Sequence, residues 1–259
     1  MTFDPGLDIS PTENPLGFCY GQGIFGPQPE LRSLDSLRRS LRDPACDGPD
    51  PVYAIVMDVG KREHRQALLD RMLLFGVVTY ARGRLGEEPI RSQGHIHKVS
   101  AHCGWSTPEV YEIWSGQTVI YMQQAAQDNP GRCYAVRAGA GDVVIVPPYW
   151  VHATISADPK EPLTFGAWCD RDYGFEYDGV RARGGIAWFP LLGPDGALRW
   201  ERNPAYGPSE LVEKSPETYA ALGLRRGEAI YRQFERDHDA FRFVYDPACA
   251  EAVWKGFVP

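Results

Sequence analysis

The sequence predicts an all-β protein whose core is a double-sheet jelly-roll barrel. Two observations support this fold class. Short segments rich in branched and aromatic residues recur along the middle of the chain, and turns rich in glycine and proline separate them at regular spacing. With 259 residues, of which 43% are hydrophobic and 24% charged, the chain is long and apolar enough to bury such a core.

The first fifty residues are rich in proline and glycine and contain one helical pattern. Its leucines fall at spacings of three and four, namely Leu31, Leu34, Leu37 and Leu41. This spacing predicts a short helix packed on the outside of the main domain. Its other faces carry Arg38, Arg39 and Arg42. A solvated helix face is the favoured interpretation of these arginines, and contact with a substrate phosphate is the alternative.

The strand pattern begins at residue 51. Strands are predicted over residues 52–59, 73–81, 90–97, 110–114, 118–124, 132–136, 142–147, 151–156, 163–168, 186–191 and 197–200. Turns are predicted at residues 83–86, 116–117, 128–131, 139–141 and 158–160. Residues 61–72 are charged with a cluster of apolar positions, which predicts an inserted helix or a long hairpin excursion.

The C-terminal part changes character after a linker at residues 203–208. A helix is predicted to open at Ser215-Pro216-Glu217, with serine as the N-cap and proline at the first helical position. A helix over 228–236, a strand over 241–245 and a helix after residue 247 follow. About fifty residues are marginal alone, so we expect them to pack on the barrel. The predicted organisation is an N-terminal segment (1–50), the barrel (51–205) and a small, mainly helical α/β extension (206–259).

Composition excludes several functional classes. The net charge of −7 and the lack of a large Lys/Arg cluster argue against nucleic-acid binding. No apolar run has the length of a membrane span, and the N-terminus lacks the pattern of a secretory signal. Six cysteines without a C-x-x-C pair are typical of reduced thiols, so a cytoplasmic location is expected.

Four side chains in the central stretch have the chemistry of a metal site. His95 and His97 are two residues apart on a predicted strand, and side-chain direction alternates along a strand, so both point to the same face. Glu109 on a neighbouring strand and His152 on a later one complete the set. Three imidazoles and one carboxylate suit a divalent first-row transition ion, and two coordination positions would remain for substrate or water.

Other residues of this stretch have competing interpretations. Glu112 is the rival carboxylate, but three residues from Glu109 it faces the other side of the strand. Tyr111 shares the face of Glu109, where a phenol either fills the barrel or bonds a ligand hydroxyl. The loop over 98–108 contains His102 and Trp105. We favour an exposed loop histidine over an additional ligand, and the loop has the size of a lid.

The same residues carry a resemblance to the cupins. The first cupin motif resembles His95-Ile96-His97 followed by Glu109, with six residues between Glu109 and Gly116. The second cupin motif resembles Gly141, Pro147 and His152, with five residues between the first two and four between the last two. Within the cupins, the run over 142–152, Glu109-Val110-Tyr111 and Asp172-Tyr173-Gly174 resemble the metal-dependent phosphoglucose isomerases of archaea and some bacteria.

This resemblance implies a cupin barrel and an aldose–ketose isomerase that interconverts glucose 6-phosphate and fructose 6-phosphate, in glycolysis and gluconeogenesis. It implies one divalent transition ion per chain (Fe²⁺, Mn²⁺, Ni²⁺ or Zn²⁺) on His95, His97, Glu109 and His152. It also implies catalytic roles for Glu109 and Tyr111, and a homodimer. An enediol route needs a base, for which Glu109 is the candidate, whereas a hydride shift needs none, and both routes stay open.

The substrate contacts implied by the resemblance are Ser92, Gly94, Thr79, Arg171 and Tyr173. Several positions depart from the family pattern. Ser92-Gln93 stands in place of Thr-Lys, Cys169 in place of a tyrosine, and Arg171 in place of a histidine. A guanidinium is a good partner for phosphate, so Arg171 is expected to bind it.

Other functions suit the same metal ligands. One is a cupin isomerase or epimerase that acts on another sugar or sugar phosphate. A second is an iron dioxygenase, since three histidines and one glutamate also suit iron-dependent oxygen chemistry. A third is a non-catalytic cupin that binds a sugar.

Overall fold

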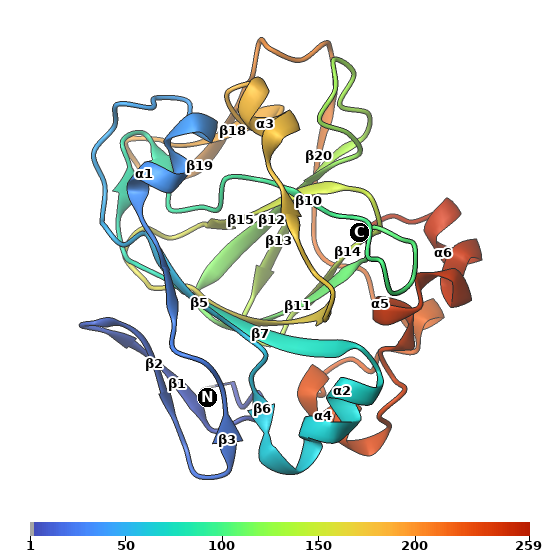
Figure 1. The fold of residues 1–259 in the computed structure, drawn as a ribbon. Helices are drawn as coiled ribbons and strands as arrows, with labels where there is room; N and C mark the ends of the chain where they lie inside the picture. The colour runs from blue at the N-terminus through green and yellow to red at the C-terminus, as the bar shows by residue number, and fades with distance from the viewer. Residues whose placement is uncertain (1–2) are drawn as a thin grey trace.

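Two β-sheets face each other across one interior and form a barrel (Figure 1). The computed structural model describes residues 3–259. The larger sheet has the order β14-β11-β16-β7-β5-β4, with strands β4 (Glu30–Arg32), β5 (Tyr53–Met57), β7 (Leu73–Tyr80), β11 (Glu109–Ser115), β14 (Val143–Val146) and β16 (Thr164–Asp170). The smaller sheet has the order β15-β12-β13-β20, with strands β12 (Gln117–Gln123), β13 (Cys133–Gly139), β15 (Val151–Ser156) and β20 (Leu211–Lys214). The predicted all-β cupin barrel is confirmed.

The larger sheet is covered on both faces. Tyr111 and Ile113 of β11 belong to the cluster inside the barrel, whereas Val110 and Trp114 belong to the cluster outside it, as alternation along a strand requires. All eight residues of β7 are buried. A strand with apolar surroundings on both faces has a nearly continuous apolar sequence, which explains the run over 73–78.

Helices cover the outer face of this sheet (Figure 1). They are α2 (Arg65–Asp70), α4 (Ile230–Arg236) and α5 (Arg242–Tyr245), with α6 (Glu251–Lys255) and the 3₁₀ turns η2 (Arg62–His64), η3 (Ala220–Leu222) and η4 (Pro247–Ala250). Trp168 of β16 packs on Tyr231 and Phe234 of α4, with ring centroids 5.4 and 5.0 Å apart. These buried rings attach the C-terminal part to the barrel.

Two C-terminal predictions are wrong. The predicted strand over 241–245 is helix α5, and no helix opens at Ser215, since residues 215–219 have no regular structure. Phe241 and Phe243 gave the segment a strand-like composition, but their packing in the outer apolar cluster decides the conformation. Strand β20 was not predicted, and it pairs in parallel with β13.

The N-terminal part contains more strands than predicted. β1 (Ile9–Glu13) and β2 (Leu16–Tyr20) form a hairpin, and β3 (Ile24–Phe25) pairs with β6 (Gly60–Lys61). The predicted helix is shorter than its leucine pattern, because it consists of α1 (Leu34–Leu37) and the 3₁₀ turn η1 (Arg38–Ser40). Ser33 caps α1 by accepting a hydrogen bond from Ser36 N at 3.3 Å. Leu31 belongs to β4 instead, and its side chain is exposed.

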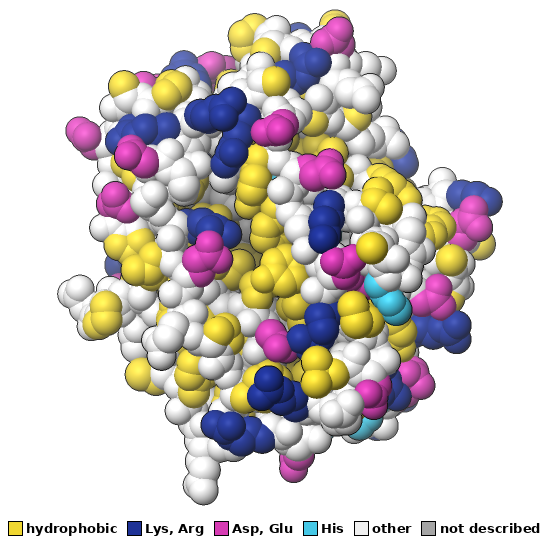
Figure 2. Space-filling view, viewed as in Figure 1, with side chains coloured by type: hydrophobic (Ala, Val, Ile, Leu, Met, Phe, Trp, Pro, Cys, Tyr) yellow, Lys and Arg dark blue, Asp and Glu magenta, His cyan; other side chains and the backbone are white. Residues whose placement is uncertain are grey.

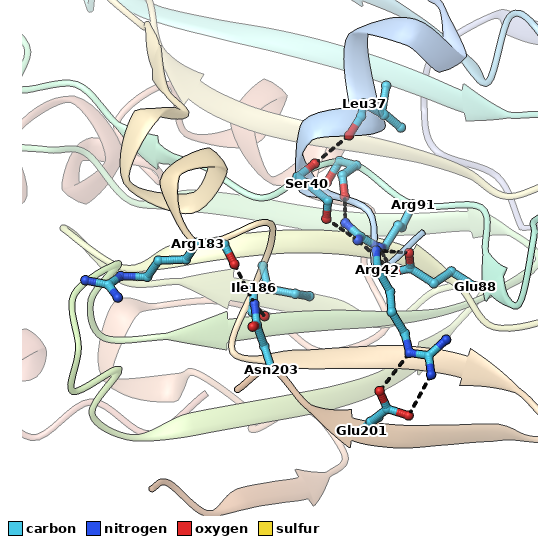
Figure 3. A network of polar contacts seen from close by, with 10 residues as sticks. Leu37, Ser40, Arg42, Glu88, Arg91, Arg183, Ile186, Glu201 and Asn203 are labelled. Atoms are coloured by element: carbon cyan, nitrogen blue, oxygen red, sulfur yellow. Dashed lines mark hydrogen bonds and ion pairs between the residues drawn. The ribbon is translucent and has the colours of Figure 1, made fainter. Parts of the chain in front are cut away.

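The predicted strand over 90–97 is mostly irregular. Only β10 (Ile96–His97) is a strand, and it pairs with β17 (Phe175–Glu176). The rest of the segment forms isolated bridges to β15, Arg91 with Ile155 and His95 with His152. The side chain of Arg91 is completely buried and pairs with Glu88 at 2.7 Å. Arg91 also donates to Ser40 O at 2.6 Å, and Arg42 N donates to Glu88 (Figure 3). This buried network attaches the N-terminal part to the segment that precedes His95.

The remaining elements are β8 (Arg84–Leu85), β9 (Glu88–Pro89), α3 (Asp178–Ala182), β18 (Trp188–Leu192) and β19 (Leu198–Arg202). Among them, α3, β18 and β19 pack on the outer face of the smaller sheet, and β8 pairs with β9. Within residues 3–259, none of the helices has the length and apolar character that a membrane crossing requires.

Candidate metal centre

Four side chains from separate parts of the barrel converge on one point. His95 precedes β10, His97 ends it, Glu109 begins β11 and His152 lies on β15. One ligand atom from each lies within 4.8 Å of the ligand atoms of the other three. The ring centroid of His95 is 5.4 Å from that of His97 and 4.2 Å from that of His152. The structure therefore brings together all four predicted metal ligands.

Backbone contacts fix the first of these residues. His95 N donates to His152 O at 3.1 Å, and His152 N donates to His95 O at 3.0 Å. Gly94 has a φ of +88°, and a Cβ there would lie 2.7 Å from Ile186 Cγ2. Glycine is required because it alone tolerates both that φ and that close approach.

The orientation of two imidazole rings is set by backbone carbonyls. His97 Nδ1 lies 2.9 Å from Thr107 O, and His152 Nδ1 lies 3.2 Å from Trp150 O. A carbonyl only accepts, so each Nδ1 carries the proton and each Nε2 presents its lone pair to the centre. Nε2 of His97 and of His152 each lie 3.2 Å from Glu109 Oε2, whereas Nε2 of His95 is buried without a hydrogen-bond partner among the described residues. Buried lone pairs that face one point fit a metal ion.

The charges of the cluster also suit a cation. Burial, and then the neighbouring imidazoles, hold the pKa of His95 well below its ordinary value, and burial lowers the pKa of His152. Burial opposes a charge on His97, but the carboxylate of Glu109 outweighs it and raises its pKa. Burial disfavours the Glu109 carboxylate as well, yet contacts with His152 and His97 hold its pKa well below the ordinary range. An ionised carboxylate among imidazoles is the donor set of a divalent transition ion.

Two further side chains hold the carboxylate of Glu109. Tyr111 Oη donates to Oε2 at 2.8 Å, and Cys169 Sγ donates to Oε1 at 3.3 Å. Burial raises the pKa of both donors well above their ordinary values, so both keep their protons.

A cavity inside the barrel opens beside the cluster. It encloses about 600 Å³, its open mouth included, and His95 and Glu109 line one side of it. Most of the remaining wall is aromatic or aliphatic, namely Tyr53, Ile55, Met57, Val78, Tyr80, Phe165, Ala167, Phe175 and Tyr177. In the view of Figure 2, hydrophobic side chains run through the hollowed middle of the face, bordered by side chains of both charges. A mostly apolar wall with a few polar groups at one side is typical of small-molecule sites.

The predicted substrate contacts lie at different distances from this cavity. Ser92 lines it, and its Oγ accepts a hydrogen bond from Thr154 N at 3.1 Å. Thr79 is buried outside it and contacts Thr164 at 3.0 Å. Gly94 shapes the backbone before His95 and is not part of the cavity wall.

Arg171 and Tyr173 lie after β16. Arg171 Nη2 contacts Asp58 at 2.7 Å and Leu73 O at 3.0 Å, and neither it nor Tyr173 lines the cavity. Tyr173 is 38% exposed and packs on Phe175, with ring centroids 5.6 Å apart.

Sequence reasoning missed several cavity residues. Arg32 comes from β4, and Phe175 and Tyr177 come from the segment after the barrel. The leucine pattern concealed Arg32, because it favoured a helix where the chain forms an edge strand. The signal that could have found it is the alternation of Glu30 and Arg32, which places both on one face of a strand.

Glu112 occupies the opposite face of β11 from Glu109. It accepts hydrogen bonds from Ile230 N at 2.7 Å and Trp114 Nε1 at 3.1 Å. Burial raises its pKa to about 8. Glu112 therefore joins the start of α4 to the barrel and is not part of the metal cluster.

The loop over 98–108 is held at its base. Ala101 N donates to Asp172 Oδ2 at 2.6 Å, and Lys98 pairs with the same carboxylate at 3.0 Å. Trp105 packs on Tyr149, with ring centroids 5.9 Å apart. His102 is exposed and lies outside the metal cluster.

Comparison with known proteins points to one family. A family model described as glucose-6-phosphate isomerase (GPI) matches residues 38–208, more than half of the chain. A glucose-6-phosphate isomerase of Sinorhizobium medicae is 28% identical over 157 residues, which cover 60% of this chain and 66% of that protein. One from Thermococcus kodakarensis is 29% identical over 135 residues, which cover 52% and 64%.

The chain spans about half to two thirds of the length of the curated relatives that it matches. Among solved structures, oxalate decarboxylase of Bacillus subtilis aligns with a TM-score of 0.35 and 17% identity, covering 49% of this chain and 28% of that chain. A likeness of this size carries no argument about function.

Proposed function

The chain belongs to the glucose-6-phosphate isomerase family, in its cupin-barrel form, and from this premise we propose that it interconverts glucose 6-phosphate and fructose 6-phosphate. The observation that supports the proposal is the opening of the His95–Glu109 side of the metal cluster into a mostly apolar cavity. A reaction at C1 and C2 of a sugar needs a metal site that the substrate can reach.

The proposed cofactor is one divalent transition ion on His95, His97, Glu109 and His152. Iron, manganese, nickel and zinc all suit this donor set, so the ligands do not select among them. When bound, the ion supplies Lewis-acid polarisation of the sugar carbonyl and stabilises negative charge on oxygen. The uncompensated Nε2 of His95, beside the other three ligand atoms, supports this assignment.

Glu109 is the proposed base of the enediol route. The contacts that lower its pKa keep it ionised, so it can accept a proton from C2 and return it to C1. Its Oε1 receives a hydrogen bond from a thiol, which is a weak donor, whereas Oε2 receives one from a phenol. Oε1 is therefore the more basic oxygen and the proposed site of proton transfer. In a hydride shift, Glu109 acts as a ligand alone.

Tyr111 is the proposed partner of the reacting oxygens. Burial keeps its phenol protonated, so it can donate a hydrogen bond to a substrate oxygen that gains charge. The apolar wall formed by Phe165 and Phe175 would exclude water from the same region.

The proposal is tested by reconstituting the metal-free protein with each of the four ions and measuring conversion of fructose 6-phosphate in a coupled assay. We expect turnover with at least one ion, and its loss in Glu109→Gln. In D₂O, the enediol route would place deuterium in the product, whereas the hydride shift would place none. A protein that holds metal but converts neither sugar phosphate would contradict the proposal, and oxygen uptake by the iron form would favour a dioxygenase.

We further propose a homodimer in the cytoplasm. The free edge of the larger sheet at β4, with Leu31 51% exposed, supports association of two copies. Free thiols at all six cysteines suit a reducing compartment. Light scattering should give twice the mass of one chain, and the mass of a single chain would contradict the dimer.

A further inference from the structure

The edge strand β4 carries two opposite charges on its inner face. Side chains alternate along a strand, so Glu30 and Arg32 share one face while Leu31 points to solvent. Arg32 lies opposite Tyr53 in the pairing of β4 with β5, and Tyr53 lies opposite Tyr80 of β7. These three side chains form one row of the cavity wall.

Arg32 is the one lysine or arginine among the described residues that line the cavity. Glu109, the only carboxylate in that wall, belongs to the metal cluster. Strand β4 lies at the edge of the larger sheet, and three strands separate it from β11, which carries Glu109. The cavity is therefore bordered by metal ligands on one side and a guanidinium on another.

We propose that Arg32 binds the phosphate of the substrate and that Glu30 occupies its guanidinium when no substrate is bound. This inference rests on the proposed function, because the phosphate of a hexose 6-phosphate is carried at the opposite end from C1 and C2. A sugar with its reacting carbons at the metal ligands needs a cation elsewhere in the cavity. Guanidinium forms paired hydrogen bonds with phosphate, which suits it to this role.

The exposure of the two partners explains how the exchange can occur. Arg32 and Glu30 form an ion pair, with 23% of the arginine side chain and 62% of the glutamate side chain exposed. An exposed carboxylate can leave such a pair at small cost, because water and salt replace the interaction. A phosphate dianion that enters the cavity then takes its place on Arg32.

Arg171 fits this role less well. Its guanidinium contacts Asp58 and a backbone carbonyl of β7, and it does not line the cavity. Its side chain is 18% exposed, and Asp58, at 33%, is more buried than Glu30. To bind substrate, Arg171 would have to leave a half-buried carboxylate and the carbonyl of buried Leu73.

Calorimetric binding of 6-phosphogluconate and gluconate tests the proposal without turnover. The two probes share a carboxylate and differ in the phosphate, and ionic strength is held constant. Arg32→Met should weaken 6-phosphogluconate binding by about ten- to a hundredfold and leave gluconate binding unchanged. Glu30→Gln should tighten 6-phosphogluconate binding by up to about threefold, because the competing carboxylate is removed. Arg32→Lys should keep part of the affinity, since it retains charge but not the fork.

The matched control is Arg82→Met. Arg82 pairs with Glu13 at 2.8 Å on the surface and does not line the cavity, so both affinities should stay at the wild-type value. Unchanged 6-phosphogluconate binding in Arg32→Met, equal weakening of both probes, or a selective loss in Arg171→Met instead would overturn the proposal.

The isomerase assay separates this inference from the proposed function. If binding is selective for the phosphate and depends on Arg32, but the protein does not convert fructose 6-phosphate, the role of Arg32 stands and the proposed isomerase function is wrong. If Arg32→Met converts fructose 6-phosphate with an unchanged KM, the proposed isomerase function stands and the proposed role of Arg32 is wrong. A wild-type protein that binds neither 6-phosphogluconate nor inorganic phosphate removes the inference.

Discussion

Two buried clusters of polar and charged side chains, one around Arg91 and one around Glu109, differ in what they leave unpaired. In the first, Glu88 accepts through both carboxylate oxygens, and each of the three guanidinium nitrogens of Arg91 donates a hydrogen bond (Figure 3). In the second, Nε2 of His97 and of His152 share one oxygen of Glu109, and Nε2 of His95 is buried without a partner among the described residues.

The difference separates a structural joint from a binding site. Burying a charge or a lone pair is unfavourable unless a partner compensates it. The Arg91 network satisfies this condition within the chain and connects Ser40, Glu88 and, through Arg42, Glu201 of β19. In the Glu109 cluster the carboxylate has partners within the chain, but Nε2 of His95 has none among the described residues. Burial and charge alone are therefore poor indicators of function. Buried polar atoms without a partner distinguish a binding site from a structural network.

The largest expected effect is the loss of activity when a ligand is removed from the incomplete cluster. His95→Ala should lower turnover by about a thousandfold or more, because an ion that polarises the substrate is worth several kcal/mol. Metal content should fall from about one ion per chain to nearly none. The unfolding free energy of the metal-free protein should change little, because the ring has an unpaired nitrogen and borders a cavity.

His102→Ala is the matched control for that variant. His102 is an exposed histidine outside the cluster, so metal content and turnover should stay at the wild-type value. Elemental analysis and the coupled assay measure both quantities. A His95→Ala protein with full metal content would remove the distinction between the two clusters.

The second effect concerns stability, and it comes from the complete cluster. Arg91→Met leaves the carboxylate of Glu88 buried without its cation, which should lower the unfolding free energy by about 3–5 kcal/mol. Replacing both partners, as in Glu88→Leu with Arg91→Met, should recover part of the loss, because no charge then remains unpaired. Urea unfolding measures each difference.

The control here is again the surface pair of Arg82 and Glu13. Arg82→Met should cost no more than about 1 kcal/mol, because an exposed pair contributes little. Equal losses in Arg91→Met and Arg82→Met would mean that the buried network is not a joint.

The sequence predicted the barrel and the convergence of the four metal-cluster residues, because both depend on local signals. Strand alternation and glycine- or proline-rich turns act over a few residues, and the motif spacings place His95 and Glu109 relative to those turns. The structure confirms the barrel, and it brings the four side chains within 4.8 Å.

The sequence could not predict features that depend on distant partners. Arg32 faces the cavity because β4 pairs with β5 some twenty residues later. The segment around Arg91 forms only isolated bridges to β15, and its guanidinium binds Ser40 O some fifty residues earlier. The segment at Phe241 has a strand-like composition, but packing on the outer face of the barrel makes it helical. Tertiary contacts override local propensity in all three cases.

Glu112 is a third kind of buried carboxylate, because both its oxygens have hydrogen-bond donors but neither has a cation beside it among the described residues. It is a buried carboxylate with two hydrogen-bond donors, Ile230 N and Trp114 Nε1. Burial raises its pKa from 4.5 to about 8. The folded state therefore holds this proton more tightly than the unfolded state. Its contribution to stability is fully present below pH 4.5 and is lost as the pH rises through about 8, by up to about 5 kcal/mol.

Glu112→Gln removes this titration, so the comparison of the two proteins isolates it. The amide leaves one of the two donors without an acceptor, which should make the variant less stable at pH 5. Wild-type protein then loses stability toward pH 8 and the variant does not, so the difference between them should shrink or change sign. Urea unfolding at pH 5, 6.5 and 8, with equal metal content, measures the difference in unfolding free energy between the two proteins. The contributions of the other titrating groups cancel in this difference. Parallel stability profiles would mean that hydrogen bonds compensate the Glu112 charge fully, and this carboxylate would then belong with Glu88 among the completed networks.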